Sequence, residues 1–117
     1  MRVLIGYEES HRSYGQTLEG AIRWLRPGVE VSLARAEDLK EEVRRGDPHV
    51  VVCNRPNAVN PGGRVAWVRI PTDPEEPSEF CLDGLRRTSR NPDFKEILAF
   101  VDEAEELVRG GQDLCGC

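Results

Sequence analysis

Six polar side chains stand directly after apolar runs of the sequence, where the ends of buried strands are expected. They are Tyr7, Glu8, Glu9, Asn54, Arg55 and Thr72. Carboxylates bind cations, and an arginine can hold a phosphate or carboxylate through two parallel hydrogen bonds. Ligands of open α/β sheets collect beyond the carboxyl ends of the strands, so we expect these residues to form a binding site there.

Candidates for acid, base or nucleophilic chemistry are weaker. His11 lies near the acidic pair at 8–9 and would suit a general base, and Cys53 would suit a nucleophile. His49 and Cys53 share one expected strand at even spacing, so they would face the same side. At a rise of about 3.3 Å per residue they stand too far apart for the hydrogen bond of a Cys-His pair. We therefore predict no catalytic residue.

The four cysteines do not form a recognisable metal or disulfide pattern. Cys53 ends an apolar run and is expected to be a small buried residue. Cys115 and Cys117 belong to a polar tail, where thiols could bind metal or oxidise, but two thiols without neighbouring histidines make a weak zinc signal. We predict no metal and no cofactor.

Charge and length limit the classes of function. The 117 residues suit a single domain, which we place at 1–111, followed by a flexible tail at 112–117. A net charge of -5 argues against a nucleic-acid partner, because binding phosphates requires a clustered basic surface. No long apolar segment predicts a membrane span, and the early polar residues do not resemble an export signal. The expected location is the cytoplasm.

The apolar periodicity predicts alternating strands and helices. Strands are expected at 3–6, 29–34, 50–53 and 65–70, and helices at 13–25, 36–45 and 94–108. The run at 50–53 is typical of a central strand buried on both faces. Asn91 is the expected N-cap of the last helix, with Pro92 at its first position. This alternation favours parallel pairing through right-handed crossovers.

The segment after Ile70 is harder to interpret. Three prolines at 71–77 interrupt any helix, so a crossover to a parallel fifth strand is not favoured. Residues 80–82 are expected to form either a short edge strand or a packed loop. The basic run at 86–90 would be a solvated approach to the last helix, an anion site or a phosphorylation target. Trp24 lies outside the apolar stripe of its helix and marks a candidate interface.

Three segments of the chain resemble the receiver domain of response regulators: Val3–Glu9, Leu25–Gly28 and Asp47–Asn54. The resemblance covers about the first half of the chain. It implies a three-layer α/β/α flavodoxin-like open sheet, mainly parallel, with strand order 2-1-3-4 and a short fifth strand.

Receivers use an acidic pair, a phosphoacceptor aspartate, a Ser or Thr, and a lysine to transfer and hold a phosphoryl group. Here Tyr7 and Glu8 fall on the acidic pair, with Glu9 adjacent, and Asn54 falls on the phosphoacceptor. Thr72 lies near the hydroxyl position, and the only lysines, Lys40 and Lys95, lie in expected helices.

An amide cannot attack phosphorus, so the resemblance implies a degenerate pseudo-receiver. We expect a non-enzymatic signalling or protein-interaction domain with a protein partner, either a second copy or another protein. The alternative is a small-molecule or anion site at the carboxyl edge of the sheet, with Arg55 as the anion ligand. No Gly-rich phosphate loop supports that alternative.

Overall fold

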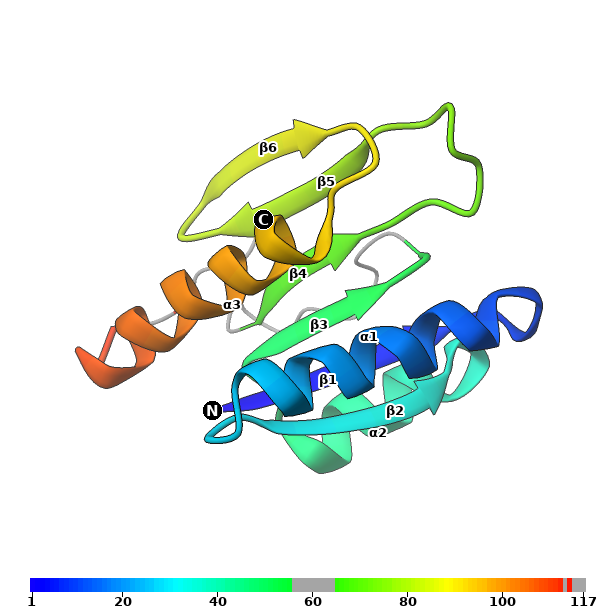
Figure 1. Ribbon diagram of the computed structural model, residues 1–117. Coiled ribbons are helices and arrows are strands. Elements are labelled where there is room, and N and C mark those ends of the chain that lie inside the picture. The colour runs from blue at the N-terminus through cyan, green and yellow to red at the C-terminus, as the bar shows by residue number, and fades with distance from the viewer. Residues whose placement is uncertain (56–64, 113, 115–117) are drawn as a thin grey trace.

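The computed structural model describes residues 1–55, 65–112 and 114. Within them the chain forms one sheet and three α-helices (Figure 1). The strands are β1 (Arg2–Tyr7), β2 (Glu30–Arg35), β3 (Val50–Cys53), β4 (Ala66–Arg69), β5 (Ser78–Leu82) and β6 (Leu85–Ser89). The helices are α1 (Arg12–Leu25), α2 (Leu39–Gly46) and α3 (Phe94–Arg109), and the short 3-10 helices η1 (Glu9–His11) and η2 (Ala36–Asp38) precede α1 and α2.

The six strands lie in the order β2-β1-β3-β4-β5-β6. β1 pairs in parallel with β2 and β3, and β3 pairs in parallel with β4. β5 is antiparallel to both β4 and β6. The sheet is therefore mixed, with a parallel half built by the first part of the chain and an antiparallel half built by the second.

The mainly parallel, flavodoxin-like sheet with a short fifth strand is thus a wrong prediction. Prolines at 71, 74 and 77 leave no helix for a crossover, so the chain turns back and β5 runs antiparallel to β4. Asp83 and Gly84 both have positive φ, at 54° and 74°, and make the two-residue turn that leads into β6. Residues 86–89 of the basic run belong to this strand, so the prediction that they form a solvated segment leading to the last helix is wrong.

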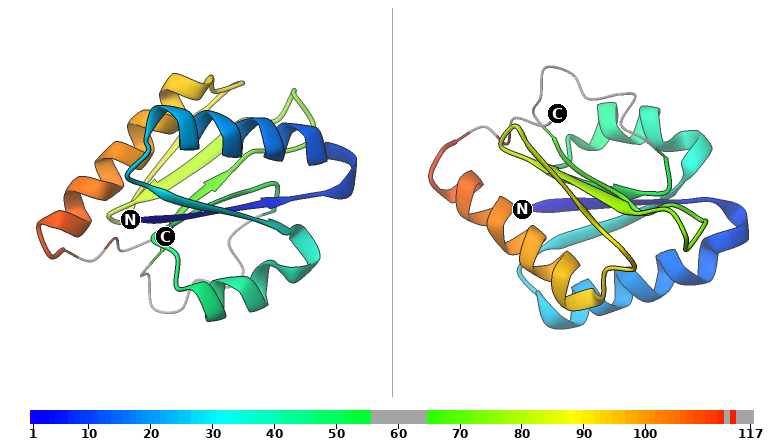
Figure 2. Two further views of the ribbon diagram at one scale, coloured as in Figure 1. Left: turned by 60° about the horizontal axis from the view of Figure 1, so that its bottom comes forward. Right: turned by 90° about the horizontal axis from the view of Figure 1, so that it is seen from above.

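Helices cover both faces of the sheet (Figure 2). α1 and α3 pack on one face, where the core includes Ile5, Val52, Phe80, Ile22 and Phe100. α2 packs on the other face, where Leu39 and Val43 meet Leu4, Val51 and Trp67. Every residue of β3 is buried, which confirms the prediction of a central strand enclosed on both sides.

The ends of the chain's last helix differ from expectation. Asp93 is the N-cap of α3, and its side chain accepts a hydrogen bond from the Glu96 N–H at 2.9 Å. Asn91 precedes it with φ at 46°, so the predicted N-cap is wrong by two residues. Beyond α3, Leu114 is buried, and its carbonyl accepts from the Asp83 N–H at 2.7 Å.

Trp24 is 83% exposed on α1, outside the buried stripe of that helix, as its position in the sequence predicts. Among the helices of residues 1–55 and 65–112, none is both long and apolar enough to cross a bilayer.

Candidate functional site

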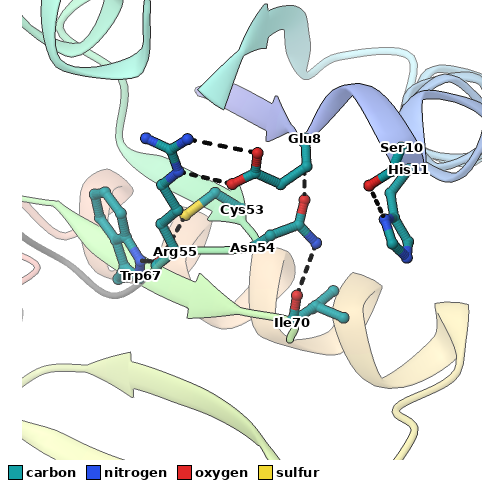
Figure 3. A network of polar contacts seen from close by, with 8 residues as sticks. All are labelled: Glu8, Ser10, His11, Cys53, Asn54, Arg55, Trp67 and Ile70. Atoms are coloured by element: carbon teal, nitrogen blue, oxygen red, sulfur yellow. Dashed lines mark hydrogen bonds and ion pairs between the residues drawn. The ribbon is translucent and has the colours of Figure 1, made fainter. Parts of the chain in front are cut away.

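Glu8 and Arg55 form an ion pair at the carboxyl ends of two neighbouring parallel strands. Glu8 follows β1 and Arg55 lies just beyond β3, and these strands pair directly. The Arg55 Nε donates to Glu8 Oε1 at 2.7 Å, and a terminal nitrogen donates to Oε2 at 3.4 Å (Figure 3). This hydrogen bonding lowers the pKa of Glu8 and raises the pKa of Arg55. Each charge is thereby neutralised by the other at the edge of the sheet.

Asn54 joins the ends of three strands through its side-chain amide. Its Oδ1 accepts from the Glu8 N–H at 3.1 Å, and its Nδ2 donates to the Ile70 carbonyl at 2.8 Å (Figure 3). Glu8 follows β1, Asn54 follows β3 and Ile70 follows β4. Only a side chain that accepts and donates at once can make both contacts, and an ionised carboxylate cannot donate. The amide of Asn54 therefore suits a structural clamp between the ends of these strands.

Cys53 is buried and chemically quiet. Its thiol donates to the Arg55 carbonyl at 3.0 Å, and Trp67 Nε1 donates to the same carbonyl at 3.2 Å. Burial raises the pKa of the Cys53 thiol to about 12, so the thiolate needed for nucleophilic attack is not formed near neutral pH. His49 lies at the opposite end of the strand, where its Nδ1 accepts from the Arg2 N–H at 2.9 Å.

The other cysteines divide into one described residue and two outside the described ranges. Cys81 is buried and disulfide-bonded, so the expectation that the cysteines form no disulfide is wrong for this residue. Cys115 and Cys117, for which the sequence leaves metal binding and oxidation open, lie outside the described residues. Among the residues that the structure describes, no group of three or more His, Cys, Asp or Glu side chains is placed to hold a metal ion.

Tyr7 and Glu9 do not join the ion pair. Tyr7 is buried beneath α1, where a Cβ at Gly15 would come within 3.1 Å of the Tyr7 Cβ. The sequence could have predicted this burial, because alternate residues of a strand share a face and Tyr7 alternates with the buried Val3 and Ile5 on β1. Glu9 pairs with Arg12 at 3.7 Å, with both side chains exposed.

Thr72 shares a small depression with Asn54, which we call the loop hollow. It has a volume of about 270 Å³ and lies among the loops after β1, β3 and β4, with His11, Tyr14, Ile70 and Ser78 also on its wall. The structure therefore brings Glu8, Asn54 and Arg55 together at one place and Asn54 with Thr72 at another. Arg55 does not line the loop hollow.

A larger depression, which sequence reasoning missed, lies between the β5–β6 hairpin and α3. This hairpin hollow measures about 550 Å³, and its wall includes Phe80, Leu82, Leu85, Arg87, Phe100 and Leu107. The Arg87 guanidinium lies 5.5 Å from the centre of the Phe80 ring and 6.0 Å from that of Phe100, and it pairs with Glu103 at 3.5 Å. The signal that could have revealed the hairpin is Asp83-Gly84, a dipeptide typical of a two-residue turn between strands.

No family model matches the chain, and the searches of curated proteins and solved structures found no match. The geometry defines the class of protein as an α/β domain with a mixed six-stranded sheet and helices on both faces. Its function has to be argued from the side chains and surfaces described above.

Proposed function

We propose that the chain is a non-enzymatic protein-interaction domain that binds its partner at β6 and the hairpin hollow. One observation carries the proposal. β6 stands at the edge of the sheet, pairs only with β5 among the described residues, and borders a hollow with an apolar floor. An unpaired edge strand exposes backbone donors and acceptors that an extended segment of another protein can satisfy.

The contacts at the carboxyl edge support binding in preference to catalysis. Glu8 and Arg55 neutralise each other, Asn54 clamps three strand ends, and the Cys53 thiol stays protonated. These polar groups already have partners within the domain, so they serve its structure. A partner surface is better provided by the exposed hairpin.

The biological setting is part of the same proposal. A signalling role fits a domain in which Asn54 and its neighbours at the carboxyl edge are used as structural contacts. The acidic chain favours a protein partner over a nucleic acid. A second copy or a different protein would both satisfy the exposed strand.

The test is selection of peptides from a random display library on the full chain, followed by mapping of the bound peptide by amide chemical shifts. We expect the largest shifts in β5, β6 and α3. The variant Leu85→Ser should weaken binding, because Leu85 is 74% exposed on the wall of the hairpin hollow. Leu25→Ser, at an exposed apolar residue of α1, is the matched control. No enriched peptide, or shifts confined to α1 and α2, would contradict the proposal.

The loop hollow supports a second candidate, which is binding of a small molecule at the carboxyl edge of the sheet. Asn54, Thr72 and His11 supply polar groups around a depression of about 270 Å³, slightly below the usual range for ligand pockets of about 300–1,000 Å³. Thermal unfolding with phosphate, nucleotides and flavin tests it, since a ligand of the native state raises the midpoint. A rise that Thr72→Val abolishes would favour this function, whereas unchanged midpoints would oppose it.

A further inference from the structure

The backbone of β6 offers hydrogen-bonding groups at two residues. In an antiparallel pair, opposed residues alternate between hydrogen-bonded and non-hydrogen-bonded pairs. Leu82 and Leu85 close the two-residue turn and form a hydrogen-bonded pair, as Phe80 and Arg87 do two positions further on. The alternation leaves Arg86 and Thr88 with their N–H and C=O groups directed away from β5. No described strand occupies that side.

The side chains of β6 divide between two different surroundings. Arg87 lies opposite Phe80, and the Ser89 hydroxyl donates to Glu96 of α3 at 2.8 Å, so residues 85, 87 and 89 face α3 and the hairpin hollow. By the same alternation the side chains of Arg86 and Thr88 are directed to the opposite face of the sheet, although Arg86 also borders the hairpin hollow. A strand added beside β6 would therefore place every second side chain near the hairpin hollow and the others beside Arg86 and Thr88.

Charge distinguishes the kind of strand that fits. The whole chain carries -5, yet residues 85–90 contain three arginines and no acid. Arg86 makes no ion pair within the described residues, and neither does Arg90, whereas Arg87 pairs with Glu103. Pairing of β6 with β6 of a second copy would bring arginines against arginines, which is unfavourable across a ladder. Arg86 would attract an acidic side chain of an added strand, whereas the acidic residues on the wall of the hairpin hollow (Asp83, Glu103 and Glu106) disfavour acids inside it.

We propose that β6 binds an extended peptide segment in which acidic and apolar residues alternate, added to the sheet as a seventh strand. The inference rests on the proposed function and names its partner. Apolar side chains of the segment enter the hairpin hollow over Phe80 and Phe100, and acidic side chains lie beside Arg86. The backbone groups of Arg86 and Thr88 supply the ladder.

The test measures fluorescence anisotropy of a labelled, end-blocked peptide of alternating Glu and Val with the full chain. The comparison peptides have the same composition in two blocks, or Lys in place of Glu. We expect the alternating acidic peptide to bind at least about tenfold more tightly than either, a difference of about 1.4 kcal/mol. Arg86→Glu should weaken binding about tenfold. Arg44→Glu on exposed α2 is the matched charge reversal and should leave it within about twofold.

The backbone contribution is tested separately. Thr88→Pro removes an N–H that points away from β5, a position at which an edge strand tolerates proline, so it should abolish binding while the domain stays folded. N-methylation of alternate peptide residues removes N–H donors of the peptide and should likewise abolish its binding to the native chain. This second test does not depend on whether the Thr88→Pro variant folds.

Several results would overturn the inference while leaving the proposed function standing. Equal affinity for the alternating and block peptides would remove the strand model, and so would full binding of the N-methylated peptide. A dimer in sedimentation that Thr88→Pro dissociates would identify a second copy as the occupant. The proposed function itself is tested by the separate display experiment. It would be refuted if no selected peptide changed the amide chemical shifts of the β5–β6 hairpin.

Discussion

Replacing Asn54 with Asp is the sharpest test of the clamp at the carboxyl edge. The substitution preserves the shape of the side chain and introduces an aspartate, the residue type that receiver domains phosphorylate. One carboxylate oxygen can still accept from the Glu8 N–H, now 3.1 Å from Oδ1. The other replaces the Nδ2 that donates to the Ile70 carbonyl at 2.8 Å and brings two acceptors into contact.

The expected magnitude follows from that single exchange. Removing the donor leaves the Ile70 carbonyl without its partner, which costs about 1–3 kcal/mol. We take about 2 kcal/mol, because Asn54 is only half-buried and water can reach part of the site. For a domain of this size each kcal/mol corresponds to about 4 °C in Tm, so Asn54→Asp should melt about 8 °C lower.

Thermal unfolding at pH 7 provides the measurement, with Asn91→Asp as the matched control. Asn91 is exposed at a φ of 46°, which Asp tolerates about as well as Asn, so its change should stay within about 0.5 kcal/mol. The Asn54→Asp variant should also gain no stability from magnesium with beryllofluoride, because Arg55 already holds the Glu8 carboxylate. Unchanged stability, or a magnesium-dependent rise in Tm, would refute the clamp.

Three further outcomes are expected. Cys53 should resist iodoacetamide at pH 8 until denaturant is added, because its pKa is about 12; rapid labelling of the native chain would contradict its burial. Glu8→Gln should lower stability at pH 7 by about 0.5 kcal/mol. The pKa of Glu8 is lowered in the folded chain, so its contribution to stability is present above the usual pKa of 4.5 and is lost as pH falls through the lowered pKa. Urea titrations should therefore show a larger stability difference between the native chain and Glu8→Gln at pH 7 than at pH 3. Gly84→Ala should cost about 1 kcal/mol, since φ is 74°, and an unchanged urea midpoint would argue against that turn.

The parallel half of the sheet was predictable because its signals are local. Val50–Cys53 is a continuous apolar run, and burial on both faces requires such a run. The stripe that includes Leu18 and Ile22 has the spacing of a helix covering a sheet, and both residues are buried. These patterns need no knowledge of which strands are neighbours.

The antiparallel half was not predictable from the same signals. β6 lies at the edge with four exposed residues followed by a partly buried one, so it has no alternation of apolar and polar residues to reveal a strand. Only Asp83-Gly84 indicated the turn. An exposed edge strand leaves little trace in hydropathy, since its pairing depends on the backbone.

The candidate site was predictable in position but not in its contacts. Placing Glu8 and Asn54 at one edge follows from parallel pairing of β1 and β3. Asn54 donates to the backbone carbonyl of Ile70, and because every residue has such a carbonyl, the sequence does not indicate which one is the partner. The pairing of Arg55 with Glu8, which removes the anion ligand expected there, depends on where each loop turns after its strand.

The change of strand direction at β4 has a consequence for how the domain folds. The parallel half closes contacts between distant parts of the chain, such as the Arg2 N–H with His49 across 47 residues. The β5–β6 hairpin closes across a two-residue turn, and hairpins form in about 1–10 μs. Loop closure slows the distant pairings, so the hairpin can be sampled long before β1 finds β3. β5 and β6, the last strands of the chain, are thus the strands whose pairing closes the shortest loop.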